Sequence, residues 1–207
     1  MSKVLLINGS PNQFGCTYTA LHEAEKALNA CGVETEIFWI GKNAVAGCTA
    51  CGACFKTGKC VFDDGVNAVA ARLNEFDGFI FGSPVYYSGP SGQICAFLDR
   101  LFYSASAGMA YKPGAAVVSC RRGGASAAFD RLNKYFTINN MPVVSANYWN
   151  QIHGNTPEEA LQDAEGLQTM RILGKNMAWL IKCIEAAKAS GVEIPEREAR
   201  IATNFIR

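Results

Sequence analysis

Short apolar runs alternate with longer segments of helical periodicity along most of this chain. Val4–Asn8 is apolar and rich in β-branched residues, and Glu34–Ile40 alternates polar and apolar side chains, so both predict strands. Three further apolar runs predict strands at Gly78–Gly82, Ala115–Cys120 and Met141–Val144.

Between these runs, apolar side chains recur three and four residues apart, which predicts helices. A helix is expected over Thr17–Cys31, because Gly32 suits the left-handed position that ends a helix. Gly65–Glu75 predicts another, and Pro157–Lys188 predicts a long final helix that two internal glycines bend or split. Two more helices are marked by the stripes Ile94, Phe97, Leu98, Leu101, Phe102 and Ala128, Leu132, Tyr135, Phe136.

Repeated strand–helix units imply parallel strands, right-handed crossovers and helices on both faces of one sheet. We therefore expect a three-layer α/β domain over residues 1–190, with a five-stranded parallel sheet in the flavodoxin-like order 2-1-3-4-5. A polar tail follows over 191–207, ending near Ile206, and is expected to pack on the domain or on a partner subunit.

The composition favours one domain with a sizeable core, since 49% of the 207 residues are hydrophobic. Lys and Arg number 19 against 18 Asp and Glu, so no nucleic-acid or membrane-surface partner is expected. The first apolar run is too short for a signal peptide, and no run is long enough to span a bilayer. These features predict a cytoplasmic protein.

Nine cysteines are many for such a chain, and an odd number excludes a complete disulfide framework. The five scattered ones, expected to be mostly small buried apolar residues, are Cys16, Cys31, Cys95, Cys120 and Cys183. The other four are clustered and are Cys48, Cys51, Cys54 and Cys60.

The clustered cysteines have the spacing C-x2-C-x2-C-x5-C, in a segment, Gly47–Cys60, that lacks any period and is expected to be a loop inserted after the second strand. The tight repeat of the first three resembles ferredoxin-type ligation of a [4Fe–4S] cluster, and Gly47, Gly52 and Gly58 provide the turns. Four thiolates also suit tetrahedral zinc, although zinc sites usually use two separated pairs. A third interpretation is a structural turn of reduced thiols without metal.

Three loops of unusual composition leave the first, third and fourth predicted strands at the edge where parallel sheets bind ligands. The first, Gly9–Thr19, joins a strand to a helix N-terminus and so predicts an anion site. It has hydroxyl donors but neither Lys nor Arg, and it matches neither the Walker A nor the G-x-G-x-x-G pattern. The alternative is an ordinary turn with a threonine cap.

The second loop, Gly82–Gly92, carries adjacent tyrosines that could flank a planar ring; the alternative is a loop with semi-buried tyrosines. The third, Ser119–Gly124, combines glycines with Arg121 and Arg122, which could neutralise a cofactor. Alternatively, one of these arginines is simply solvated or pairs with Asp130.

Together with the segment Phe97–Arg100, these loops look like the FMN sites of the NAD(P)H-dependent FMN reductase family, over roughly residues 3–155. The family places the phosphate on the first loop, the isoalloxazine on the second and its other side on the third. Asn12 stands where a basic residue is frequent in the family. The FMN-binding residues that the resemblance implies are Ser10, Asn12, Cys16, Thr17, Tyr18, Thr19, Pro84, Val85, Tyr86, Tyr87, Ser88, Gly89, Ser119, Arg121, Gly123 and Gly124.

The resemblance implies an FMN-dependent oxidoreductase that passes electrons from NAD(P)H to a quinone, flavin or similar small acceptor. The cysteine segment also resembles the iron-sulfur flavoproteins, which implies an alternative: a carrier between a ferredoxin-like donor and a redox partner, without nicotinamide turnover. With only His22 and His153, no hydrolase constellation is visible. Trp179 on the final helix predicts a homodimer or homotetramer, and Tyr148–Gly154 is expected either to cover the ligand site or to plug the sheet edge.

Overall fold

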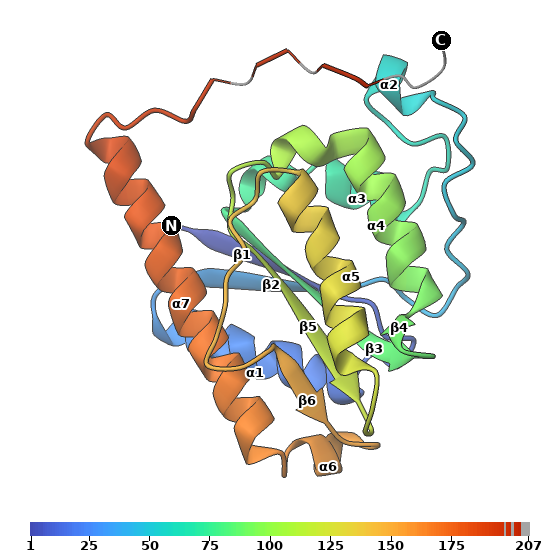
Figure 1. Cartoon of the computed structure of the whole chain (residues 1–207), viewed down its shortest axis with the longest axis vertical. Helices are drawn as coiled ribbons and strands as arrows, with labels where there is room; N and C mark the ends of the chain where they lie inside the picture. Colours follow the sequence, from blue (N-terminus) through green and yellow to red (C-terminus); the bar gives the residue numbers. More distant parts are fainter. Residues whose placement is uncertain (197, 200, 204–207) are drawn as a thin grey trace.

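The protein is described by a computed structural model in which residues 1–196, 198–199 and 201–203 are placed (Figure 1). Its central sheet has five parallel strands in the spatial order β2-β1-β3-β5-β6. This is the predicted order 2-1-3-4-5 and confirms the flavodoxin-like topology. The parallel strands are β1 (Lys3–Asn8), β2 (Glu34–Trp39), β3 (Gly78–Tyr86), β5 (Gly114–Cys120) and β6 (Gln151–His153).

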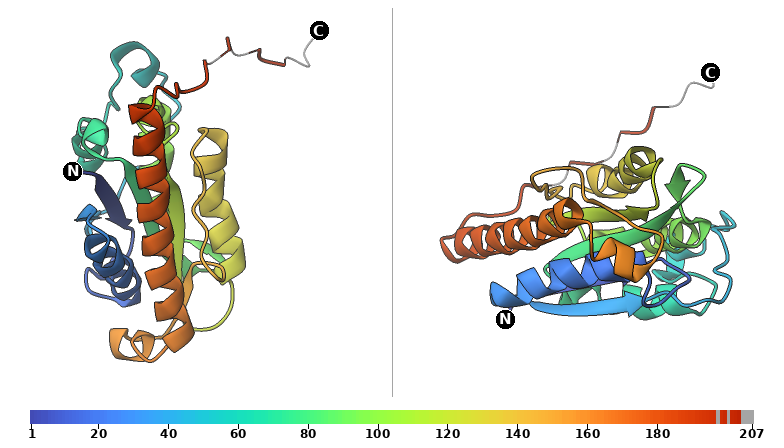
Figure 2. Two further views of the ribbon diagram at one scale, coloured as in Figure 1. Left: turned by 90° about the vertical axis from the view of Figure 1, so that its left-hand side faces the viewer. Right: turned by 90° about the horizontal axis from the view of Figure 1, so that it is seen from below.

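Helices cover both faces of the sheet, so the predicted three layers are confirmed (Figure 2). Helices α1 and α7 pack on one face, and α3, α4 and α5 pack on the other. The helices are α1 (Cys16–Ala30), α2 (Cys54–Thr57), α3 (Gly65–Ala70), α4 (Gly92–Ala105), α5 (Ala125–Ile138), α6 (Pro157–Ala160) and α7 (Ala164–Ala189), with 3-10 turns at Leu73–Glu75 and Ser106–Gly108.

The core consists of two apolar clusters, one on each face of the sheet. Leu5 and Ile7 of β1 point into the cluster under α3, α4 and α5, while Val4 and Leu6 point into the cluster under α1 and α7. Because both faces of β1 are buried, its sequence is a continuous apolar run and not an alternating one. That run made this strand easy to predict.

The predicted fifth strand at Met141–Val144 is wrong. This segment makes only an isolated bridge between Val143 and Gly114, and the strand proper is β6, Gln151–His153. The chain leaves the sheet edge and returns at Asn150, whose carbonyl accepts from the Val118 N–H at 2.9 Å and whose side chain donates to the Ala116 carbonyl at 3.0 Å. A three-residue strand preceded by a side-chain bond carries too little periodicity to be recognised.

Three other boundaries differ from prediction. The antiparallel strand β4 (Gly89–Pro90), which was not predicted, pairs with the end of β3, so β3 extends to Tyr86. The cysteine segment is not wholly a loop, since α2 begins at Cys54. The helix expected over Gly65–Glu75 ends at Ala70 and continues only as a 3-10 turn.

The long final helix is split, but not at a glycine. The break lies between α6 and α7, where Asp163 caps α7 by accepting from the Gly166 N–H at 2.9 Å. Helix α7 then runs unbroken through Gly166 and Gly174. Gly174 lies where α1 crosses α7, because a Cβ there would be 2.6 Å from the Ala24 carbonyl oxygen. Its function is therefore close helix contact and not a bend.

Residues 191–196 lie beyond α7 outside any helix or strand. The predicted packing of the tail cannot be followed to its end, since residues 197, 200 and 204–207, Ile206 among them, lie outside the described residues. Across the described part of the chain, no helix combines the length and the apolar character needed to cross a membrane.

Replacing Gly174 with alanine should destabilise the protein. The added methyl group would meet the α1 backbone, and overpacking of this kind costs about 1–3 kcal/mol. Alanine's better helix propensity returns only about 1 kcal/mol, which leaves a net loss of between about 0 and 2 kcal/mol in the free energy of unfolding. Because the clash is with backbone, which cannot rotate away, we expect a value near the upper end, about 2 kcal/mol. Urea unfolding followed by circular dichroism measures the difference.

Gly92→Ala is the matched control, because Gly92 is also a helical glycine, at the start of α4, but a Cβ there would meet open space. Its unfolding midpoint should equal that of the parent or exceed it. Equal midpoints for Gly174→Ala and the parent would show that α1 and α7 separate without cost.

Candidate functional site

An open hollow lies at the carboxyl edge of the sheet, where the loops after β1, β3 and β5 meet. It encloses about 730 Å³ of space, part of which is open solvent. The lining residues are Ser10, Asn12, Gly15, Cys16, Thr17, Pro84, Val85, Tyr86, Ser119, Cys120, Arg121, Gly154, Asn155 and Pro157.

The three loops predicted to share one site are thus brought together, each through part of its predicted residues. The predicted residues that do not line the hollow are Tyr18, Thr19, Tyr87, Ser88, Gly89, Gly123 and Gly124. Tyr18 stacks on His22, with ring centroids 5.4 Å apart, and the Thr19 hydroxyl donates to the Gly15 carbonyl within its own helix. Gly123 is exposed beside the third loop.

The first loop is shaped by the fully buried Asn8 at the end of β1. Its Oδ1 accepts from the Ser10 N–H at 3.0 Å, and its Nδ2 donates to the Gln13 carbonyl at 2.9 Å. Ser10 in turn accepts from the Asn12 N–H at 3.1 Å, and its carbonyl accepts from the Trp39 indole at 2.8 Å. Asn8 was missed as a site residue, although a polar residue at the end of an apolar strand was a visible signal.

The N-terminus of α1 faces this hollow without a capping side chain. Gly15 is the N-cap, and no acidic residue lies in the first turn. The first-turn N–H groups and the positive end of the helix dipole therefore remain available to an anion. The alternative of a threonine cap is wrong. Thr17 instead shares a buried hydrogen bond of 2.8 Å with Ser119 of β5, which fixes the first loop to the third.

The second loop has a fixed base and an exposed tip. Ser91 donates its hydroxyl to the Gly9 carbonyl at 2.9 Å, and its N–H donates to Ser83 Oγ at 2.9 Å. At the tip, Tyr87 and Ser88 adopt positive φ angles of 49° and 60°. Tyr87 is fully exposed, so the alternative of semi-buried tyrosines is wrong for this residue, whereas Tyr86 is 48% exposed and agrees with it. Only Tyr86 turns toward the hollow.

The third loop depends on Gly124, which has a φ of 91°. A Cβ at this position would lie 2.8 Å from the Cα of Ser88, so only glycine lets the second and third loops touch. Arg121 and Arg122 are both exposed, and within the described structure neither forms an ion pair with Asp130. Arg121 lines the hollow and is its one arginine or lysine.

The fourth wall of the hollow was only partly predicted. Gly154, Asn155 and Pro157 follow β6, and the Gly154 carbonyl accepts from the Cys16 thiol at 3.5 Å. Burial raises the pKa of this thiol. The segment Tyr148–Gly154 was expected either to cover the ligand site or to plug the sheet edge, and of its residues Gly154 lines the hollow. The misplaced fifth strand hid the contribution of Asn155 and Pro157. Tyr148 and Trp149 themselves line a separate polar hollow.

The four clustered cysteines line a second hollow, beside Phe62, Arg100 and Tyr103, that encloses about 330 Å³ of space including open solvent. Cys48 and Cys51 are exposed, whereas Cys54 and Cys60 are half-buried. No carboxylate or histidine shares the lining, so the donor set is purely thiol and suits an iron-sulfur cluster or zinc. Within the described residues, no three potential ligands converge as they stand on one metal-binding point. The donor chemistry therefore fits the group. To bind it together with Cys54 and Cys60, the exposed Cys48 and Cys51 would have to move toward them.

The scattered cysteines are less buried than predicted. Cys120 is buried, but Cys183 on α7 is exposed. The remaining three, Cys16, Cys31 and Cys95, are half-buried at the margins of the apolar clusters. All nine are free thiols.

Comparison with known proteins matches residues 2–156 to the family described as NADPH-dependent FMN reductase. The chain belongs to the NADPH-dependent FMN reductase family. The match covers all four walls of the hollow up to Asn155, while α7 lies beyond it. Family membership makes this a flavin-binding oxidoreductase, and the hollow, with the uncapped N-terminus of α1 and the aromatic Tyr86 in its lining, fits FMN.

Similar proteins extend the likeness beyond the matched residues. An iron-sulfur flavoprotein of Methanocaldococcus jannaschii is 34% identical over 191 residues, covering 88% of this chain and 99% of that one. An iron-sulfur flavoprotein of Methanosarcina thermophila is 29% identical over 187 residues, covering 88% and 97%. Among solved structures, RosB with a bound 8-demethyl-8-formylriboflavin-5'-phosphate superposes with a TM-score of 0.71 at 14% identity, covering 100% of this chain and 94% of that one.

Replacing Thr17 with valine should weaken FMN binding. The variant keeps the side-chain volume but removes the hydroxyl that bonds Ser119 and lies at the predicted phosphate site. Losing one hydrogen bond to a charged group costs about 1–2 kcal/mol, so we expect the FMN dissociation constant to rise about tenfold. Quenching of FMN fluorescence on titration with the FMN-free protein measures it.

Thr19→Val serves as the matched control, since the Thr19 hydroxyl bonds only its own helix and does not line the hollow. Its affinity should equal that of the parent. Equal affinities for both variants would place the phosphate away from α1.

Proposed function

We propose that this protein is an FMN-dependent oxidoreductase that transfers electrons from NAD(P)H to a small acceptor such as a quinone or a free flavin. The main support for this proposal is the hollow at the carboxyl edge of the sheet, where three loops, the uncapped N-terminus of α1 and the exposed Tyr86 meet. The family, whose description includes dependence on NADPH, supports the nicotinamide donor.

Bound FMN would supply the hydride and electron chemistry, so the chain needs no catalytic acid of its own. Ser10, Thr17 and the first-turn N–H groups of α1 would hold the phosphate with neutral donors. Pro84, Val85 and Tyr86 offer apolar and aromatic surface to a planar ring. Arg121 brings a positive charge to the same hollow, which favours an anionic ligand.

A second candidate is favoured by the four cysteines around one hollow. In this alternative, Cys48, Cys51, Cys54 and Cys60 hold a [4Fe–4S] cluster, and the protein carries electrons between a ferredoxin-like donor and a redox partner. The relatives named iron-sulfur flavoproteins support it. The two hollows lie toward opposite ends of α4, since Gly92 adjoins the second FMN loop and Arg100 is about 12 Å further along the helix.

A homo-oligomer, dimer or tetramer, is part of the proposal. Trp179 on the outer face of α7 is 68% exposed, and Tyr148 and Trp149 form an exposed aromatic pair with ring centroids 4.9 Å apart. Apolar surface of this kind is typical of contacts between chains. A second copy could also bring its cysteines toward the FMN hollow of the first. Sedimentation at micromolar concentration tests this, and a monomer would contradict it.

A cytoplasmic location stays a prediction.

The FMN-loaded protein should oxidise NAD(P)H, and a quinone should accelerate the reaction, because the exposed hollow leaves a bound ring open to both. Absorbance of the nicotinamide at constant protein concentration measures the rate, and the FMN-free protein is the control.

Mass spectrometry of the released cofactor should find FMN. Recovery of FAD alone would contradict the single-phosphate site. Reduction by ferredoxin without any response to NAD(P)H would instead favour the carrier.

Anaerobic reconstitution should load about four iron and four sulfide per chain if the second candidate holds. Cys51→Ser should lower the iron content strongly, because it removes one thiolate from the hollow. Cys183→Ser is the matched control, since Cys183 is equally exposed but lies on α7. Fewer than about one iron per chain in the parent protein would leave a plain flavin reductase.

A further inference from the structure

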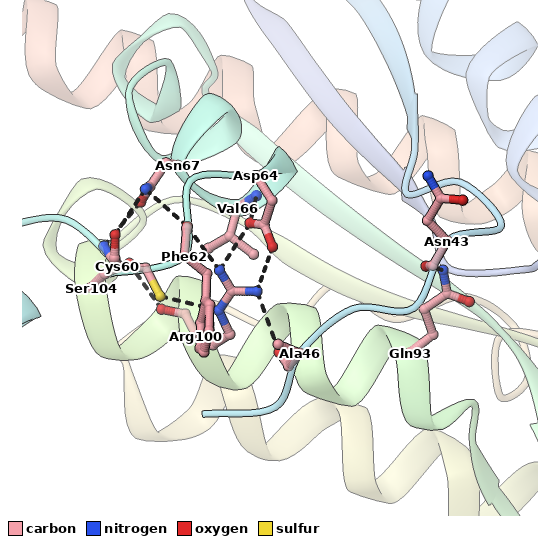
Figure 3. Close-up of polar contacts among 10 residues, drawn as sticks. All are labelled: Asn43, Ala46, Cys60, Phe62, Asp64, Val66, Asn67, Gln93, Arg100 and Ser104. Carbon is pink, nitrogen blue, oxygen red and sulfur yellow. Dashed lines mark hydrogen bonds and ion pairs between the residues drawn. The ribbon is translucent and has the colours of Figure 1, made fainter. Parts of the chain in front are cut away.

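Beside the cysteine hollow, helix α4 buries an arginine almost completely. Arg100 is 1% exposed and is the largest fully buried side chain in the described part of the molecule. Figure 3 shows its guanidinium at the centre of contacts from the segments on both sides of the cysteine loop. Burying a charge is costly unless it is paired and hydrogen-bonded, so this arginine needs an explanation.

All five N–H donors of Arg100 have partners. A fork to Asp64 has N···O distances of 2.7 and 2.9 Å. The same two nitrogens donate to the carbonyl oxygens of Ala46 at 3.3 Å and Phe62 at 3.1 Å. The fifth donor, Nε–H, points at Cys60 Sγ at 3.1 Å. Arg100 thus donates one of its five N–H groups to the sulfur of Cys60, and a sulfur atom is a weak acceptor unless it is a thiolate.

The guanidinium remains charged in this setting. Arginine is not deprotonated in proteins, and the ion pair with Asp64, with N···O distances of 2.7 and 2.9 Å, compensates its charge where the side chain is buried. The ring of Phe62 lies 4.9 Å from the guanidinium carbon and shields one of its faces. The positive charge is therefore held permanently beside the Cys60 sulfur.

Cys60 is also held through its backbone. The Asn67 side chain accepts from the Cys60 N–H at 2.9 Å and donates to the Cys60 carbonyl at 2.9 Å. Asn67 lies on α3, which is capped by Asp64, the partner of Arg100. Cys60 is thus fixed at both its backbone and its sulfur, in contrast to the exposed Cys48 and Cys51.

We propose that Arg100 is the positioning residue of the cysteine site: its Nε–H hydrogen bond fixes Cys60 as the preformed ligand and raises the reduction potential of a cluster bound there. This inference rests on the second candidate function. Hydrogen bonds and positive charge near ligand sulfurs stabilise the added electron, so they raise the potential. Asp64 opposes this effect by compensating the charge of Arg100.

Substitutions of Arg100 and of Asp64 should therefore shift the reduction potential of the cluster in opposite directions. Arg100→Lys and Arg100→Gln remove the bond to Cys60 and should lower the ratio of reduced to oxidised cluster at a fixed potential about tenfold, which is about 59 mV for one electron. Asp64→Asn leaves Arg100 without its counter-charge and should raise the same ratio. Redox titration of the full-length, anaerobically reconstituted protein, followed by electron paramagnetic resonance, measures all of them, with iron-to-FMN ratios alongside.

Arg131→Gln is the matched control. Arg131 is another arginine paired with an aspartate, Asp99 at 3.4 Å, but it lies on α5 and does not line the cysteine hollow. This variant should keep the iron content and potential of the parent protein. A shift as large as that of Arg100→Gln would show a general charge effect and overturn the proposal.

The outcomes separate this inference from the function beneath it. A parent protein that takes up no iron overturns both. A parent that takes up about four irons, with Arg100 variants of unchanged iron content and potential, overturns only the role of Arg100. Loss of iron with retention of FMN in the Arg100 variants supports it. If those variants lose FMN as well, Asp64→Asn decides, because a raised potential supports the proposal and an unchanged one overturns it.

Discussion

The burial of a parallel sheet on both faces is the constraint on which this protein depends. With β1, β3 and β5 covered by helices on either side, every strand must lead into its helix across the same edge. Polar groups cannot lie in either core, so they collect where the strands end. The FMN hollow is built at that edge from a buried asparagine, a serine–threonine pair and glycines that let loops touch. Its chemistry follows from the topology.

The parts of the fold that sequence alone could predict are those in which local pattern and burial agree. Strand β1 and helix α1 have clear apolar patterns because their neighbours cover them fully. The loops of the hollow were recognisable because glycine, proline and hydroxyl residues have local reasons to follow a strand. Two of the failures share one cause, since the side chain of Asn150 adds a bond to β5 just before β6 begins, and α7 begins at a cap made by Asp163. Single side-chain bonds leave no periodic trace.

The cysteine site shows the same limit more strongly. Its spacing was visible, and the four thiols do share one hollow. What the spacing could not reveal was the support from elsewhere in the chain, because Arg100 is forty residues beyond Cys60 and was noted only as part of an FMN reductase motif. Asn67 and Asp64 carry no signal of this role in the sequence, since an amide and a carboxylate near a helix start are ordinary caps. Long-range partners of this kind become visible only in three dimensions.

The guanidinium of Arg100 also determines how separable the cysteine segment is from the rest of the chain. It bonds Ala46, just before the segment, and Phe62, just after it, so the two ends of the excursion leave and rejoin the domain at one point. Closing such a short gap costs little chain entropy, and the sheet, both cores and the flavin hollow make no use of the residues between. The cysteine segment is therefore a separable insertion: it could be gained or lost during evolution, or exchanged by design, without a change in the fold of the flavin-binding domain.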